Sequence, residues 1–101
     1  MPRVVFGPEA RREAHEAREW YESKAKGLGL EFARAVDAIC SSIKRFPEAY
    51  PVVTRQYRQA VLRRFPYSII YEIMDSEIIV LRCFHHRRDP AVWQGSQRNA
   101  D

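Results

Sequence analysis

The spacing of apolar residues changes once along this chain, and that change limits the folds it can adopt. Before Pro47, apolar side chains recur every three to four residues, as Phe32, Val36 and Ile39 do, which is the period of an amphipathic helix. After Pro51 the period falls to two, the alternation of a β-strand. A helical first half followed by a strand-rich second half is typical of an α+β fold.

The first half predicts a short strand and two antiparallel helices. The strand, Val4 to Phe6, ends at Gly7-Pro8, and proline suits the first position of a helix. A helix is therefore expected over about residues 8–25, and the glycine pair after Lys26 should reverse the chain into a second helix that ends before Pro47. The buried face of the first helix is expected to hold Ala10, Ala14, Ala17 and Tyr21, with Arg11, Arg12, Glu13, Glu16 and Glu19 mostly on the opposite face.

The second half predicts strands at roughly residues 57–64, 67–74 and 77–84, with Asp75-Ser76 as the last turn. In the final strand Ile78, Val80 and Phe84 are expected on the face opposite Ile79, Leu81 and Cys83. The expected order is β-α-α-β-β-β, an α+β fold in which a helical hairpin packs on a mostly antiparallel four-stranded sheet.

A short helical turn is expected at about residues 90–94, because Pro90 can begin a helix. Residues 1–94 should form a single domain and residues 95–101 a frayed C-terminal tail. The 101 residues leave no room for a second independent core.

Charge placement points to an anionic partner for the second half. The net charge is +4, and residues 49–101 carry eight bases, all arginines, against five acids.

No apolar run has the roughly 20 residues that a membrane helix needs, and the N-terminus lacks a secretory signal, so a cytoplasmic location is expected. Cys40 and Cys83 lie in apolar patterns and are expected to be reduced core thiols.

Motifs for metal or nucleophilic chemistry are incomplete. The segment from His15 to Glu19 has glutamate where a zinc-protease helix needs its second histidine. Ser41-Ser42-Ile43-Lys44 lies late in a helix without the companion motifs of acyl-transfer enzymes. His85 and His86 are neighbours in a strand, so they point to opposite faces and would not readily reach one ion. No metal or other cofactor is expected.

Arg63, Arg64, Arg87 and Arg88 form the most informative set, because the sheet pattern brings the ends of separate strands together. Guanidinium groups bind phosphate or carboxylate through two parallel hydrogen bonds. The set has three interpretations: a solvated rim, a docking site for an acidic protein, or a nucleic-acid contact.

The segment Phe84 to Trp93, FHHRRDPAVW, closely resembles the C-terminal signature of ParE toxins and of the plasmid-stabilisation proteins in the RelE/ParE superfamily. Four further segments resemble that superfamily in the same order. They are Phe6-Gly7-Pro8-Glu9-Ala10, Trp20-Tyr21-Glu22, Gly27-Leu28-Gly29 with Phe32, and Leu62 to Tyr71. The resemblance covers about residues 3–93.

The resemblance implies the toxin of a type II toxin–antitoxin pair, held inactive in a hetero-oligomeric complex by a cognate antitoxin, often of the ParD type. In ParE-like members the target is DNA gyrase, and in RelE-like members it is mRNA on the ribosome. Both branches share one fold, so fold does not choose between them.

The residues aligned with the RelE-type basic set favour the ParE branch. RelE-type ribonucleases place lysines and arginines on the middle strands, where this chain has Gln59, Val61 and Ser68. An inhibitory binding toxin without catalytic residues is therefore favoured. A ribonuclease using Arg87 and His86, or a diverged inactive member, is the alternative. The residues expected to bind target or antitoxin are Arg63, Arg64, His85, His86, Arg87, Arg88 and Trp93.

Overall fold

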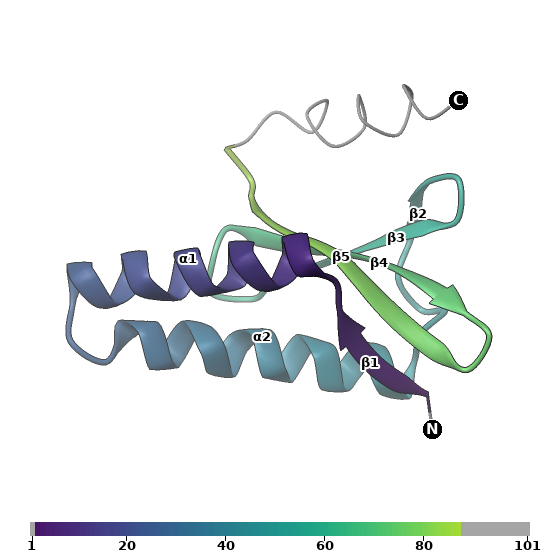
Figure 1. Ribbon diagram of the computed structural model, residues 1–101, viewed down its shortest axis with the longest axis horizontal. Coiled ribbons are helices and arrows are strands. Elements are labelled where there is room, and N and C mark those ends of the chain that lie inside the picture. Colours follow the sequence, from purple (N-terminus) through teal and green to yellow (C-terminus); the bar gives the residue numbers. More distant parts are fainter. Residues whose placement is uncertain (1, 88–101) are drawn as a thin grey trace.

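Two antiparallel helices pack on a five-stranded sheet in the computed structural model, which describes residues 2–87 (Figure 1). The predicted α+β class and the helical hairpin are confirmed. The predicted turn at 90–94, the tail, Arg88 and Trp93 lie outside the described residues. No helix in the described part is long and apolar enough to cross a membrane.

The sheet has the order β1-β5-β4-β3-β2, so the first strand lies beside the last one. Strand β1 (Arg3–Phe6) runs parallel to β5 (Glu77–His85), with Val4 opposite Ile78. The other neighbouring strands are antiparallel. Since β5 has a neighbour on each side, its apolar residues are central to the sheet, as the sequence predicts.

The helical hairpin consists of α1 (Pro8–Lys24) and α2 (Leu28–Arg45). Gly27 joins them at a φ of 88°, a left-handed conformation that glycine adopts without steric cost. Gly29 already lies in α2, where an added Cβ would come within 2.8 Å of a carbonyl oxygen of α1. The Glu22 carboxylate accepts hydrogen bonds from the backbone N–H groups of both glycines, each at 3.0 Å, and these bonds lower its pKa. The predicted glycine turn is thus confirmed.

The second half contains one strand more than expected, and one strand is shorter. Strand β2 (Val52–Thr54) has three residues, too few to give a clear alternating pattern. Strand β3 (Tyr57–Val61) stops before Leu62, whereas the sequence predicts a strand to residue 64. The loop before β4 (Tyr67–Met74) is closed by a hydrogen bond from the Leu62 N–H to the Tyr67 carbonyl. Arg63 and Arg64 therefore lie on a loop rather than on a strand.

An aromatic cluster fills the core between the helices and the sheet. The Phe32 ring centroid lies 5.3 Å from those of Tyr21 and Phe65 and 5.1 Å from that of Tyr67. Tyr71, at the centre of β4, is fully buried, and its hydroxyl donates to the Pro47 carbonyl at 2.6 Å. Offset and edge-to-face pairs stabilise such a cluster beyond the burial of their area.

A β-bulge between β4 and β5 changes which residues face the helices. Ile70 pairs with Arg82 and Tyr71 pairs with Val80, so Leu81 is the extra residue. As a result Cys83 joins the core beside Ile78 and Val80, while Phe84 packs with Ile70 on the other face. The prediction that placed Phe84 with Ile78 and Val80 is wrong, because the bulge breaks the alternation.

Glu13 is buried, contrary to the prediction that placed it on the charged face of α1. Its carboxylate accepts hydrogen bonds from Arg82 Nε at 3.0 Å and Arg82 Nη2 at 2.6 Å. It also accepts one from the Cys83 backbone N–H at 2.9 Å, at the bulge. The ion pair fixes α1 to β5 and raises the pKa of Arg82, mainly through the hydrogen bond to Glu13.

Candidate functional site

The described part of the predicted arginine set lies at one end of the sheet. Tyr67, which follows the β3–β4 loop, pairs with His85 near the end of β5. The His86 N–H also donates to the carbonyl of Pro66 in that loop, at 2.7 Å. Arg63 and Arg64 lie on the loop that precedes Tyr67, and this loop contacts the segment that carries Arg87.

Although they share this end of the sheet, the arginines line two different hollows. Arg63 and Arg64 face α2, whereas Arg87 lines a smaller hollow against α1. The structure therefore divides the predicted set into two candidate surfaces, one on each side.

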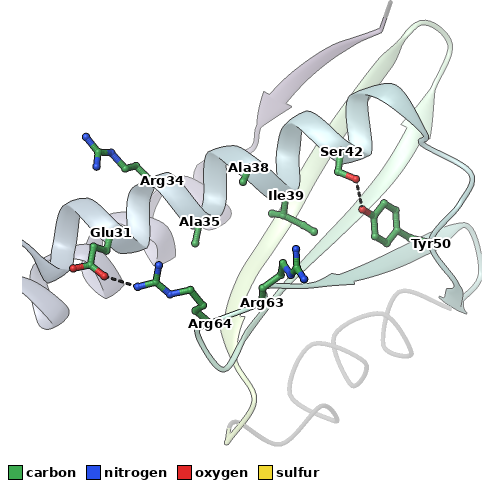
Figure 2. A pocket seen from close by; sticks show the side chains of 9 residues that line it. All are labelled: Glu31, Arg34, Ala35, Ala38, Ile39, Ser42, Tyr50, Arg63 and Arg64. Carbon is green, nitrogen blue, oxygen red and sulfur yellow. Dashed lines mark hydrogen bonds and ion pairs between the residues drawn. The ribbon is translucent and has the colours of Figure 1, made fainter.

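The larger hollow, which we call the α2 slot, has a volume of about 860 Å³ (Figure 2). Its helical wall is a stripe of small and apolar side chains, Ala35, Ala38 and Ile39, and Ser42 continues the stripe. The described residues that line it are Glu31, Arg34, Ala35, Ala38, Ile39, Ser42, Tyr50, Arg63 and Arg64. A volume of this size can hold several side chains of a bound molecule.

Each end of the α2 slot carries a polar interaction between α2 and the chain facing it. At one end the Arg64 guanidinium forms an ion pair with Glu31 (Figure 2). At the other end the Ser42 and Tyr50 hydroxyl oxygens are 2.6 Å apart in a hydrogen bond. Arg58 Nη1 donates to the Tyr50 carbonyl, also at 2.6 Å, so the segment that carries Tyr50 is itself held in place. The slot therefore has defined walls.

Arg63 lies between these two ends and reaches from the loop toward Ile39, whereas Arg34 projects away from the slot (Figure 2). Arg63 is exposed, and within residues 2–87 it has no ion pair. Among the described residues, the charged groups directed into the slot are those of Arg63, Arg64 and Glu31, and the glutamate is paired with Arg64. The remaining positive charge of Arg63 suits a carboxylate.

The smaller hollow, the β5-end hollow, has a volume of about 310 Å³ between α1 and the end of β5. Trp20, which is 53% exposed, and Glu16 lie on its α1 side, and His85 and Arg87 lie on its β5 side. The His85 ring packs edge-on against Tyr67 with centroids 5.0 Å apart. Its Nδ1 accepts the Arg87 backbone N–H at 2.9 Å, so the histidine orders the turn after β5.

On the sheet face opposite the helices, this chain has the uncharged residues Gln59, Val61 and Ser68 at the positions aligned with the basic residues of RelE-type ribonucleases. Gln59 Nε2 donates to the Ser68 hydroxyl at 2.9 Å, and His86 Nε2 lies 2.9 Å from the same oxygen. Ser68 is fully buried, and Val61 is an exposed apolar residue. His85 and His86 thus form their hydrogen bonds with different groups. His86 lies in the turn after β5, so the prediction that both histidines are strand neighbours is wrong for His86. The free thiols of Cys40 and Cys83 lie in and against the core, as predicted.

Sequence reasoning missed the α2 wall of the slot and the role of Tyr50. Ile39 belongs to the apolar stripe that the helical period predicts, and it is only partly buried against the core. The signal that could have found the wall is the pair Ala35 and Ala38, small residues three positions apart beside the apolar stripe of α2.

Comparison with known proteins identifies similar folds in solved structures. The chain is similar to a chromosomal ParDE toxin–antitoxin structure from P. aeruginosa, with a TM-score of 0.62 and 19% identity over 84% of this chain and 96% of that one. It is also similar to the isolated E. coli RelE toxin, with a TM-score of 0.60 and 13% identity over 98% and 99% of the two chains. It is also similar to the YoeB dimer from Staphylococcus aureus, with a TM-score of 0.53 and 16% identity over 84% of this chain and 97% of that one.

At these identities the structural likeness shows the fold and does not choose a target. No curated protein sequence matches the chain. The family model for the ParE toxin of the type II toxin–antitoxin system parDE matches residues 4–90, which is most of the chain. The chain therefore belongs to the ParE toxin family of type II toxin–antitoxin systems.

Proposed function

We propose that this protein is a toxin that inhibits DNA gyrase by binding it, and that a cognate ParD-like antitoxin neutralises it. The observation that carries the proposal is the neutral sheet face formed by Gln59, Val61 and Ser68. Gyrase inhibition is what the ParE resemblance implies, and the sheet face argues against the RNA-cleaving alternative.

Cleavage of RNA without a metal needs cations around the scissile phosphate, because negative charge grows on it in the transition state. An amide, an isopropyl group and a buried hydroxyl occupy the aligned positions here. Removal of one electrostatic donor typically costs about 100- to 1000-fold in rate, and several positions are neutral in this chain. A catalytic site on this face would therefore lack most of its stabilising charge.

The ribonuclease alternative depends on Arg87 and His86, and their contacts do not favour it. His86 Nε2 lies 2.9 Å from Ser68 Oγ, so this nitrogen is already in a hydrogen bond. The Arg87 backbone N–H donates a hydrogen bond to His85 Nδ1, and not to His86. A general base and a cation acting on one phosphate would need to approach it together.

We place the gyrase contact at the end of β5, where His85 and Arg87 line the β5-end hollow with Trp20. An exposed indole next to a guanidinium is typical of residues that dominate protein–protein binding energy. Arg88 and Trp93 extend the same segment in the sequence, outside the described residues. We propose a cytoplasmic location, because gyrase is found there.

A supercoiling assay with purified gyrase tests the proposal. Wild-type toxin in stoichiometric excess should stop supercoiling, and Arg87→Glu should weaken inhibition at least about 10-fold if Arg87 forms a charge-assisted bond with the target. Arg18→Glu is the matched control, because it reverses another exposed arginine that lines neither the α2 slot nor the β5-end hollow. Unimpaired supercoiling with excess wild-type toxin contradicts gyrase inhibition.

Primer extension on translated mRNA tests the alternative in the same preparation. A gyrase inhibitor leaves the mRNA intact, whereas a ribosome-dependent nuclease produces cuts in the ribosomal A site. Cuts that disappear in Arg87→Ala would assign the protein to the RelE-like activity. A protein that neither stops supercoiling nor cuts mRNA would be an inactive family member.

A further inference from the structure

Two neighbouring histidines hold the turn after β5, and they do so with different chemistry. His85 ends β5 and is half-buried, and its Nδ1 accepts the backbone N–H of Arg87 at 2.9 Å. His86 lies in the turn, and its Nε2 is 2.9 Å from the hydroxyl oxygen of Ser68. Contacts of both imidazole rings therefore fix the segment that carries Arg87.

Of these two contacts, only that of His85 requires a particular protonation state. A backbone N–H can only donate a hydrogen bond, so His85 Nδ1 must offer a lone pair and the ring must be neutral. A serine hydroxyl can donate or accept, so the contact between His86 and Ser68 is possible whether or not Nε2 carries a proton. Protonation of His85 would place two N–H groups against each other, and the bond to Arg87 would be lost.

The charges around the His85 ring do not compensate for this loss. Among the described residues, the titratable groups that line the β5-end hollow with it are Glu13, Glu16, Tyr67, Cys83 and Arg87. Both carboxylates form ion pairs with arginines, and burial raises the pKa of the Cys83 thiol to about 12, which keeps the thiol neutral. A proton on the ring would therefore add a second positive charge to a hollow that Arg87 already lines.

We propose that His85 is a positioning residue for target binding, because its neutral ring holds the turn that presents Arg87 to the hollow lined by Trp20. Protonation of the ring releases this turn and weakens binding of the target. This inference rests on the proposed function, since it takes gyrase as the target of the β5-end hollow. It adds a dependence on pH: binding is strongest when the ring is neutral and weakens as the pH falls through the range in which imidazole gains a proton, near about pH 6.5.

A substitution at His85 can keep the acceptor and remove the titration. The bond joins a side chain to the backbone N–H two residues later, which is the contact that asparagine makes in an Asx turn. Asparagine and leucine are similar in size and neither has a ring, so both substitutions lose the edge-on contact with Tyr67. Between His85→Asn and His85→Leu, only the asparagine variant supplies an acceptor for Arg87.

Biolayer interferometry with immobilised gyrase tests the inference at about pH 8 and about pH 5.5, on either side of the imidazole range. At the higher pH, His85→Asn should bind about 3- to 10-fold more tightly than His85→Leu, which is the net effect of one hydrogen bond. At the lower pH, the Kd of the wild type should rise by a similar factor relative to that of His85→Asn, a ratio that cancels effects of pH on gyrase itself. His15→Asn removes an exposed histidine of α1 outside the hollow and should keep the pH dependence of the wild type.

The outcomes separate this inference from the proposed function. If gyrase binds neither the wild type nor any variant, gyrase is not the target and the positioning role falls with it. If gyrase binds the wild type, and His85→Asn shows the same pH dependence or the same affinity as His85→Leu, the proposed function stands and the role of His85 is wrong. Circular dichroism must show that each variant is folded at both pH values, and if His85→Leu is not, the comparison of the wild type with His85→Asn decides alone.

Discussion

Removal of the Glu13 carboxylate should be among the most damaging single changes in this fold. The side chains of Glu13 and Arg82 are only 6% and 19% exposed, so water cannot replace the lost partner well. In Glu13→Ala the Arg82 guanidinium loses its ion pair and the Cys83 N–H loses its acceptor. Breaking one side of a buried pair costs about 3–5 kcal/mol, a large part of the about 5–15 kcal/mol that stabilises a typical domain.

Urea unfolding followed by circular dichroism measures this loss, and two further variants test its cause. Glu13→Leu combined with Arg82→Met removes both charges, so it should recover more than half of the stability lost in Glu13→Ala. Arg12→Ala breaks ion pairs on the exposed face of the same helix and should leave the unfolding midpoint unchanged. The reasoning is refuted if Glu13→Ala loses less than about 1 kcal/mol, or if the double variant is no more stable than Glu13→Ala.

Three further predictions concern the helical hairpin and the thiols. The pKa of Glu22 is lower in the folded protein than its unfolded value near 4.5. Its contribution to stability is therefore complete above pH 4.5 and is lost as the pH falls through the lowered folded pKa. Measuring the unfolding midpoint at decreasing pH should show this loss, and the Glu22→Gln variant should not show it. Gly29→Ala should destabilise the fold by about 1–3 kcal/mol, because the added Cβ would collide with α1. Gly27→Ala adds a Cβ that meets no neighbour, so it should cost about 1 kcal/mol through backbone strain alone. Equal melting temperatures for the two variants would contradict this. Burial raises the pKa of Cys40 to about 11 and of Cys83 to about 12, so Ellman's reagent at about pH 8 should label both much more slowly in native than in unfolded protein, and fast native labelling of Cys83 would show that the core opens.

The sequence predicted those parts of the fold that have a strong local signal. The helical period around Phe32 and Val36 and the glycine turn at Gly27 are local properties, and the structure confirms them. Strand β2 and the early end of β3 were missed because the first is too short for a period and the second ends where a loop closes on Tyr67. Neither the bulge nor its effect on Phe84 is visible in the sequence, since a bulge depends on pairing between two strands.

The candidate site was predictable in its charge and not in its shape. Arginine clustering in the second half gave Arg63 and Arg87, and the topology brings their segments to one end of the sheet. That they line separate hollows depends on how the loop packs against α2 and β5 against α1, which are long-range contacts. Glu13 was assigned to the solvent because its partner Arg82 is 69 positions away in the sequence.

The parallel pairing of β1 with β5 has a consequence for truncated products of this gene. Arg3 and Glu77 are 74 positions apart, and β5 lies between β1 and β4 in the sheet. A polypeptide that stops before β5 would leave β1 without a neighbour and Glu13 without its partners Arg82 and Cys83. Nonsense and frameshift mutations upstream of Glu77 should therefore yield fragments that do not fold.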